Sequence, residues 1–141
     1  SKAIFAPLNL PAVGVFDVDS SSFSTIDISD QASAISFRGA AAVGSKVVFA
    51  PYRAHAVGVF DVSDNSFSTV SIQSQLDTDL KFAGAAVVGE RVVFAPFRSD
   101  SIGIFHTSTG TFDTLDISTT LAIEDKFVGA VSVGNQVFFA P

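Results

Sequence analysis

Cysteine, methionine and tryptophan are absent from the chain, and only eight of its 141 residues are lysine or arginine. Without cysteine there are no disulfides and no thiolate metal sites, so redox chemistry does not indicate a compartment. Fourteen acidic residues bring the formal net charge to −6, and phosphate neutralisation needs clustered basic side chains. No apolar run approaches the ~18 residues of a membrane span. The composition therefore argues against nucleic-acid and membrane partners.

Motifs that carry catalytic chemistry are missing as well. The chain has no Gly-rich phosphate loop, no nucleophile elbow and no His-Glu-x-x-His zinc motif. The segments that start at Asp17 and Asp61 are similar to the opening of a calcium loop, but they lack its Gly and its closing Glu. Turns in which Asp and Ser bond their own backbone explain these segments better. We therefore expect no catalytic residues, no metal site and no cofactor.

The chain instead contains a strong internal repeat. The triplet Phe-Ala-Pro occurs four times, at spacings of 44, 45 and 45 residues, and begins at Phe5, Phe49, Phe94 and Phe139. Further columns keep the same spacing: Gly14, Gly58 and Gly103; Phe23, Phe67 and Phe112; Gly39, Gly84 and Gly129; Gly44, Gly89 and Gly134. So many columns in register exclude chance, and a period of this length is typical of propeller blades.

Each repeat predicts four strands joined by tight turns. In the second repeat we expect them at 36–43, 46–50, 56–62 and 66–72, and we name them strands A, B, C and D. These segments are rich in Val, Ile, Phe, Thr or Ala and are bounded by turn residues. Gly44-Ser45 joins A to B, and a two-residue loop that opens with Gly suits a primed hairpin turn. No segment shows a helical period, so we expect an all-β chain.

Residue sizes favour a β-propeller over a sandwich of stacked hairpins. Strand A is built of small residues, as in Gly39-Ala40-Ala41-Ala42 and Gly84-Ala85-Ala86, and the innermost strands of a propeller crowd its axis. Strands B and C carry the Phe and Val that would fill the space between four-stranded antiparallel blades. Four phenylalanines are therefore predicted to be buried between neighbouring blades: Phe49, Phe60, Phe94 and Phe105.

The repeat resembles the kelch repeat and its galactose-oxidase-like relatives, and the resemblance covers the whole chain. The matching stretch runs from Arg38-Gly39 through Gly44 and Phe49 to Val57-Gly58-Val59-Phe60-Asp61 and Phe67. Three features depart from the kelch pattern. Ala-Pro replaces the paired glycines after strand B, Phe replaces the usual Tyr and Trp, and His106 stands where the other copies have Asp17 and Asp61. The resemblance implies a propeller that serves as a binding scaffold.

The repeat boundaries do not coincide with the first and last residues. Residues 1–30 predict strands B, C and D of a first blade, 36–72 a second blade and 81–118 a third. Residues 126–141 predict a strand A, which would close the first blade, and a repeated strand B. Propellers typically have about four to eight blades, so we expect three blades to complete a ring by self-association. A homodimer with six blades is favoured and a homotrimer with nine comes next; a piece of a longer propeller, excised or engineered, is the remaining alternative.

One face of the expected ring carries the candidate binding residues. Because the strands alternate in direction, the B–C and D–A loops lie on the same side of a blade. The B–C loops contribute aromatic and arginine side chains at aligned positions, and the D–A loops contribute charges at 77–81 and 124–126. Such aromatic and Arg side chains are common at interfaces. The candidates are Asn9, Tyr52, Arg53, His55, Phe97, Arg98 and Asp100.

A simpler interpretation of this face is that Tyr52 and Phe97 pack between neighbouring blades while the charges are solvated. The histidines do not change this picture, because His55 and His106 fall at opposite ends of a blade and do not share a site within one repeat. We therefore predict a non-catalytic propeller scaffold whose partner is a second copy of itself. A module that binds a protein or a glycan is the alternative.

Overall fold

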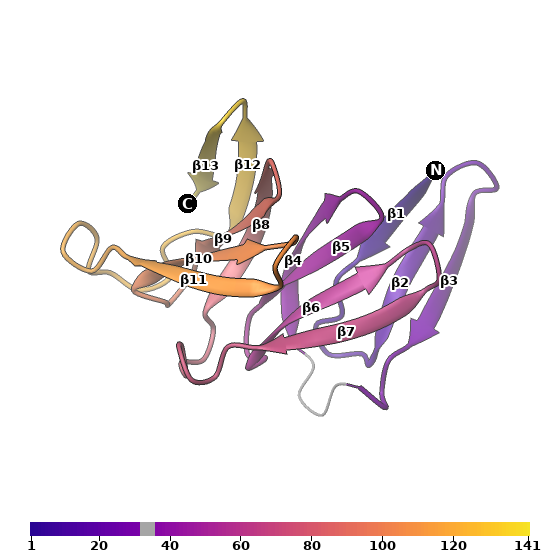
Figure 1. Ribbon diagram of the computed structural model, residues 1–141, viewed down its shortest axis with the longest axis horizontal. Coiled ribbons are helices and arrows are strands. Elements are labelled where there is room, and N and C mark those ends of the chain that lie inside the picture. Colours follow the sequence, from indigo (N-terminus) through magenta and orange to yellow (C-terminus); the bar gives the residue numbers. More distant parts are fainter. Residues whose placement is uncertain (32–35) are drawn as a thin grey trace.

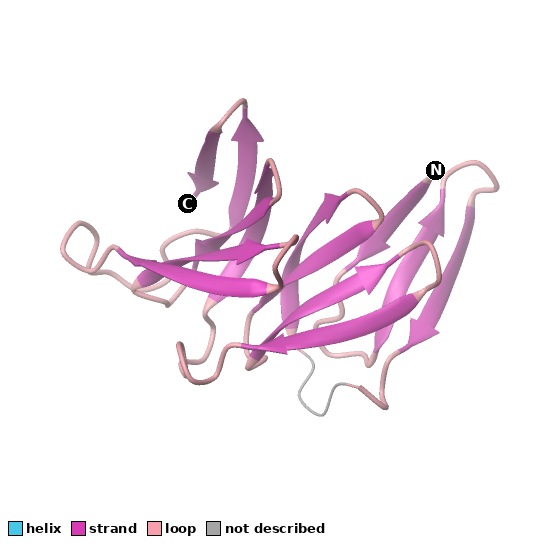
Figure 2. Ribbon diagram, viewed as in Figure 1, coloured by secondary structure: helices cyan, strands magenta, loops and turns pink. Residues whose placement is uncertain are grey.

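The computed structural model describes residues 1–31 and 36–141, and every regular element within them is a β-strand (Figure 2). In this described part, no helix is long and apolar enough to cross a membrane. The strands are β1 (Lys2–Phe5), β2 (Ala12–Asp17), β3 (Ser22–Asp27), β4 (Phe37–Val43), β5 (Lys46–Pro51), β6 (Ala56–Asp61), β7 (Ser66–Ser71), β8 (Phe82–Val88), β9 (Arg91–Pro96), β10 (Ser101–His106), β11 (Thr111–Asp116), β12 (Gly129–Val133) and β13 (Gln136–Ala140).

The strands form four antiparallel sheets that follow one another along the chain (Figure 1). Two of them, β4–β7 and β8–β11, are complete four-stranded sheets in which each strand pairs with the next one in sequence. These strands correspond to A, B, C and D of the repeat. The first sheet, β1–β3, contains B, C and D, and β12 and β13 form a hairpin of A and B. The predicted all-β architecture of antiparallel sheets is confirmed.

Strand ends differ from the predicted ones by one residue at several places. Strand A of the second repeat begins at Phe37 rather than Ser36, because the Ser36 carbonyl accepts hydrogen bonds from the N–H groups of residues 52–54 at 2.9, 3.1 and 3.3 Å. Strand D of the same repeat ends at Ser71. The next carbonyl, that of Ile72, accepts bonds of a turn instead. The loops therefore take over backbone groups that the ladder would otherwise use.

Tight turns fix the two hairpins of each blade. Gly44, Gly89 and Gly134 have φ angles of 59°, 59° and 57°, a left-handed conformation that glycine adopts without steric cost. In the C–D turn of the second repeat, Asp61 Oδ1 accepts a hydrogen bond from the Ser63 N–H at 3.0 Å. Both turn types follow from the residues that the sequence places there.

Each sheet has two different apolar faces, which we call the Phe face and the Val face. The Phe face of β4–β7 consists of Phe37, Val47, Phe49, Phe60 and Phe67. Its Val face consists of Ala41, Val43, Val48, Val57, Val59, Val70 and Ile72. The two hydrophobic clusters pack the Val face of one sheet against the Phe face of the next, from β1–β3 to β4–β7 and from β4–β7 to β8–β11. The core therefore lies between blades, and the predicted burial is confirmed at Phe49, Phe60, Phe94 and Phe105.

Three phenylalanine rings pack over a glycine on each complete Phe face, and we call them the Phe triad. In β4–β7 the ring centroids of Phe37, Phe49 and Phe67 lie 5.9 to 6.4 Å apart. A Cβ on Gly58 would lie 3.0 Å from the Phe37 ring, so the rings occupy the space that a side chain there would need. The triad of β8–β11 consists of Phe82, Phe94 and Phe112.

The innermost strands approach each other at glycines. A Cβ on Gly39 would lie 2.8 Å from the backbone of Gly84, and a Cβ on Gly84 would lie 2.8 Å from the backbone of Gly129. At Gly129 itself the nearest atom is the Ala140 Cβ at 3.5 Å. Strands β4, β8 and β12 therefore pack side by side because these positions carry no side chain, as the small residues of strand A predicted.

The two ends of this stack of sheets each hold part of a Phe triad. Phe5 and Phe23 of β1–β3 lie 6.2 Å apart, and Phe127 and Phe139 of the C-terminal hairpin lie 5.4 Å apart. The first sheet and the hairpin are at opposite ends of the molecule (Figure 1). The predicted closure of the first blade by residues 126–141 would therefore have to join two chains.

Candidate functional site

The B–C and D–A loops lie together, as the alternating strand directions predicted. Arg98 Nε donates a hydrogen bond to Asp125 Oδ1 at 2.8 Å, and Glu124 lies 3.9 Å away. The bond to Asp125 raises the pKa of the Arg98 guanidinium. Lys126 Nζ donates to Asp100 Oδ1 at 3.2 Å. Both ion pairs join a B–C loop to the D–A loop that follows it, so they connect neighbouring repeats.

The aromatic side chains of this face contact each other. The ring centroids of Tyr52 and Phe97 are 5.8 Å apart. The guanidinium carbon of Arg38 lies 5.1 Å from the centroid of Tyr52 and 5.5 Å from that of Phe97, an arrangement worth roughly 0.5–1 kcal/mol at an exposed site. The sequence identified the two rings but not Arg38, because the aligned positions hold Ala83 and Val128.

The remaining candidate residues do not join this aromatic pair. Asn9 and Arg53 are exposed. His55 Nδ1 lies 3.1 Å from Asp77 Oδ1, without hydrogen-bond geometry. The other histidine has a different neighbour, since His106 Nε2 lies 2.9 Å from Asp113 Oδ2. The seven predicted residues are thus divided among an aromatic pair, two ion pairs, one histidine contact and two exposed side chains.

Two lysines of the D–A loops are buried, where the simpler interpretation predicted solvated charges. Lys81 has no exposed surface (0%), and its Nζ donates to the Thr78 carbonyl at 2.6 Å. Burial lowers the pKa of Lys81, and two nearby carboxylates partly oppose this effect. Lys126, at the aligned position, is also buried. Ser36, at the aligned position of the second repeat, is buried as well, at 7% exposure.

The aspartates of the C–D turns bond their own backbone, as predicted. Asp17 Oδ1 accepts hydrogen bonds from the N–H groups of Asp19 and Ser20 at 3.0 and 3.1 Å. The bond from Ser20 is the main cause of the lowered pKa of Asp17. Within residues 1–31 and 36–141, no group of three or more potential metal ligands was found.

An apolar hollow lies on the Phe face of β1–β3. It has a volume of about 360 Å³ and is lined by residues that include Phe5, Leu8, Leu10, Gly14 and Phe23. Phe5 and Phe23 are 53% and 63% exposed, whereas the aligned Phe49 and Phe67 are 0% and 5% exposed. The difference arises because the Val face of β1–β3 covers β4–β7. In the described part of the chain, no sheet covers β1–β3 in the same way.

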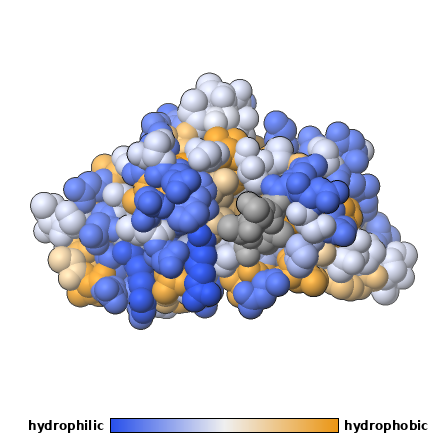
Figure 3. Space-filling view, turned by 90° about the horizontal axis from the view of Figure 1, so that it is seen from below, coloured by the Kyte–Doolittle hydropathy of each residue, from blue (hydrophilic) through white to orange (hydrophobic). Residues whose placement is uncertain are grey.

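The opposite end of the molecule exposes a Val face. Leu115 of β11 is 56% exposed, while the aligned Val70 packs against the second hydrophobic cluster. Val131 and Val133 of β12 are 58% and 63% exposed. The underside of the molecule, which lies away from the β12–β13 hairpin, also shows hydrophobic residues between hydrophilic ones (Figure 3). Apolar side chains in such number are typical of surfaces that associate.

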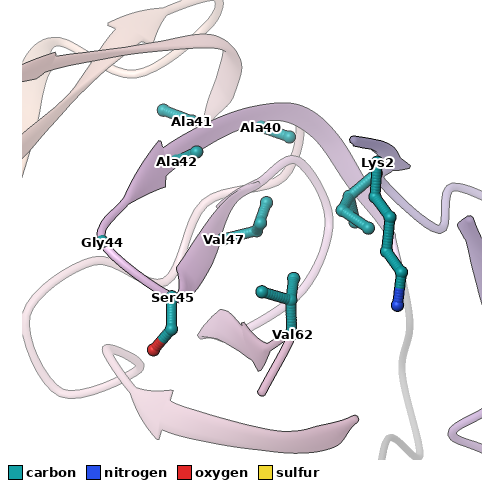
Figure 4. A pocket seen from close by; sticks show the side chains of 9 residues that line it. Lys2, Ala40, Ala41, Ala42, Gly44, Ser45, Val47 and Val62 are labelled. Atoms are coloured by element: carbon teal, nitrogen blue, oxygen red, sulfur yellow. The ribbon is translucent and has the colours of Figure 1, made fainter. Parts of the chain in front are cut away.

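A second cavity, of about 390 Å³, lies between β1 and β4. Its lining includes Lys2, Ile4, Ala41, Ala42, Val47 and Val62. The close-up shows Val47 and Val62 beside the alanines of β4, with Lys2 across from them (Figure 4). The cavity borders the free edge of β1, where strand A of a complete blade would pair. Within the described residues no strand pairs with that edge, so the cavity occupies the place that strand A has in the complete blades.

No protein-family model matches the chain, and no curated protein matches it. Solved structures with similar folds include virginiamycin B lyase from Staphylococcus aureus, at a TM-score of 0.72 and 12% identity over 97% of this chain and 47% of that one. A streptogramin B lyase gives a TM-score of 0.69 and 17% identity over 99% and 44%. AztD from Citrobacter koseri gives 0.54 and 10% over 81% and 34%.

The chain thus spans less than half the length of the two lyases that it resembles. Identities below 20% carry the fold and leave activity open. The neighbours are β-propeller-type folds, in agreement with the stacked antiparallel sheets of this chain. The chain has a β-propeller fold.

Proposed function

We propose that this chain is a non-catalytic β-propeller scaffold that completes a ring by head-to-tail association with copies of itself. One observation carries the proposal: the Phe face exposed at one end and the Val face exposed at the other are the surfaces that pack at the internal junctions. Two chains would supply six blades and three would supply nine. We favour six, because two-fold dimers are the commonest oligomers.

The exposed aromatic rings give the association a driving force. A fully buried Phe contributes roughly 1.5–3 kcal/mol relative to an exposed one. Phe5 and Phe23 are about half exposed in the single chain, so covering both rings would contribute about 2–3 kcal/mol per interface by the same estimate. Leu115 and the valines of β12 add to this on the other side.

The inner strands support the same geometry. The missing side chain of Gly39 leaves room for Gly84, and that of Gly84 leaves room for Gly129. Gly129 also lacks a side chain, and within the described residues no further inner strand packs against it. A Gly39 from the next copy would continue the series and place a fourth inner strand at the axis.

Within the propeller class, a kelch-like relationship is supported by Arg38-Gly39 on strand A and by Phe60-Asp61 at the end of strand C. A scaffold role is favoured over a glycan site at Tyr52 and Phe97. The Arg38 guanidinium lies over both rings, on which a sugar would otherwise stack. The ion pairs of Arg98 and Lys126 likewise connect repeats rather than point to a ligand.

Light scattering of the purified chain over a range of concentrations tests the proposal. We expect twice the chain mass of 14.7 kDa for six blades or three times that mass for nine. Phe23→Ser should shift the equilibrium toward single chains. Val18→Ser is the matched control, because Val18 is 52% exposed but lies in a C–D turn outside the Phe face. A folded single chain at every concentration would refute the proposal, and closure by further repeats of a longer chain would then explain the exposed faces.

A further inference from the structure

We propose that the cavity between β1 and β4 receives strand β12 of a second copy. We further propose that β13 occupies its position beside β12 only in the single chain, and that β1 of the second copy displaces it there. The inference rests on the proposed self-association and specifies which strands exchange. In the single chain, β13 pairs with β12 over five residues. In the assembled ring, β12 would pair with β1 of the neighbour, and the closing blade would consist of β12 from one chain and β1–β3 from the other.

The internal junction shows what fills the corresponding space. Between β4–β7 and β8–β11, Ala41 and Val43 of strand A pack against a cluster that contains Val48 and Val92. The residues aligned with Val48 and Val92 one junction earlier are Ile4 and Val47, and both line the cavity. No strand A pairs with β1 in the described part of the chain, so the space beside these two residues stays open.

The side chains of β12 match this space. Val131 and Val133 align with Ala41 and Val43, and they are 58% and 63% exposed in the single chain. Two valines are bulkier than an alanine and a valine, and the cavity volume of about 390 Å³ leaves room for the larger residue. Apolar side chains without a partner at one end of the chain therefore correspond to a largely apolar cavity at the other, whose polar lining is Lys2 and Ser45.

The divided Phe triads agree with the same exchange. The complete triads take one ring each from strands A, B and D. Phe127, which precedes β12, would supply the first ring, and Phe5 and Phe23 of the second copy would supply the other two. Phe139 of β13 occupies the position beside Phe127 that Phe5 would take, with a centroid distance of 5.4 Å.

Two strand B segments compete for one position, and the anchoring of β1 decides between them. β1 pairs with β2, the Val18 N–H bonds the Ser1 carbonyl at 2.8 Å, and the Phe37 N–H bonds the Pro7 carbonyl at 2.9 Å. Replacement of β1 by β13 would break these bonds. It would also put Phe138 in the place of Ile4, beside the space that Val131 and Val133 would fill in the ring, and extra bulk in that filled junction is destabilising. β13 is therefore the strand that leaves.

The register of the internal blade fixes which residues would face each other. Ala42 of β4 lies opposite Val47 of β5, so Ser132 of β12 would lie opposite Ala3 of a second copy. Within its own chain, Ser132 lies opposite Val137. Because the chain has no cysteine, pairs of introduced cysteines report on each arrangement without background. Directly opposite residues have Cβ atoms about 4.5–5.5 Å apart, within reach of a short bifunctional thiol reagent.

The first experiment treats the full chain carrying Ala3→Cys and Ser132→Cys with such a reagent. We expect covalent dimers or trimers on a denaturing gel, whereas Ser132→Cys alone should stay mostly monomeric. Strands β1 and β12, which carry residues 3 and 132, are separated by β4–β7 and β8–β11 within one molecule (Figure 1), so a link between these residues joins two copies. If light scattering shows association but this pair does not cross-link, the strand exchange is refuted while the proposed self-association stands.

The second experiment fixes β13 in its position beside β12. Cross-linking of a Ser132→Cys, Val137→Cys variant fixes β13 on β12, and we expect the linked chain to remain single while the untreated variant associates. A matched pair of substitutions adds an independent measurement. Phe5→Ser should weaken association, and Phe139→Ser should leave it unchanged or strengthen it. Association of the linked chain, or the opposite order for the two serine variants, would show that β13 stays in place and β1 leaves.

Discussion

A single added methyl group at an inner glycine should distinguish the packing of strands within one chain from the association between chains. Gly84 and Gly129 occupy aligned positions, and neither has a positive φ. Alanine is therefore acceptable to the backbone at both. The space differs, because the new Cβ would lie 2.8 Å from backbone atoms at Gly84 and no closer than 3.5 Å to any atom at Gly129.

The magnitude follows from that contact. To bring 2.8 Å to an ordinary contact of 3.4 Å, the inner strands must move apart by at least about 0.6 Å, which loosens the core between the blades. Overpacking of this kind costs about 1–3 kcal/mol, and the loss of glycine flexibility returns about 0.5–1 kcal/mol. Gly84→Ala should therefore lose about 1–2 kcal/mol, or roughly 4–8 °C of Tm for a chain of this size. Gly129→Ala should be neutral or slightly stabilising in a single chain.

Thermal unfolding followed by circular dichroism, at concentrations low enough for single chains, measures the first effect. Light scattering at higher concentration measures the second, because in the ring the Cβ at position 129 would meet the backbone of Gly39 from the next copy. We expect Gly129→Ala to fold normally and to remain at 14.7 kDa. Parental melting of Gly84→Ala, or equal destabilisation by both substitutions, would refute the packing of inner strands described above.

Two further predictions concern the core and the turns. Phe60→Ala removes a ring with no exposed surface and should lower the free energy of unfolding, measured with denaturant, by about 3–5 kcal/mol. The control Phe16→Ala, at the half-buried aligned position, should lower it less. An unfolding midpoint of Phe60→Ala equal to that of the unmodified chain would show that the blade faces are assigned wrongly. Hydrogen bonds from backbone N–H groups lower the pKa of Asp27 and Asp116 from 3.8, so their contribution to stability is present above about pH 3.8 and is lost as the pH falls through the lower folded-state values. The Tm should drop in this acid range, and Asp27→Asn with Asp116→Asn should flatten that drop; an identical acid profile for this variant would contradict it.

Much of the fold could be predicted from the sequence because each strand and turn occurs several times at aligned positions. The Gly columns set the A–B turns, and the alternation of Val and Phe on strands B and C sets the two faces of each sheet. Small errors arose where loops use backbone groups at a strand end, as at Ser36. Such bonds depend on how a loop folds back, which residue type does not encode.

The candidate site was less predictable than the fold. Tyr52 and Phe97 were found because they occupy aligned positions. Arg38 was missed because the aligned positions of the other repeats hold no arginine. The sequence indicates a solvated charge at Lys81, and neither Ser36 nor Lys126 in the same column predicts burial, because both residue types are mostly exposed in proteins. The complementary cavity beside β1 depends on what two neighbouring sheets leave unfilled, and a list of residues does not contain that information.

The identical construction of every junction also determines how stability is distributed along the chain. Each sheet is held by its own ladder and by the faces it shares with its neighbours, so the chain behaves as a short row of coupled units. β4–β7 has a partner on both faces, whereas β1–β3 has a partner on one. The middle blade is therefore the most cooperative part, and opening should start at the two terminal units and spread inward. Closing the row into a ring would remove this gradient, because every unit would then have two neighbours.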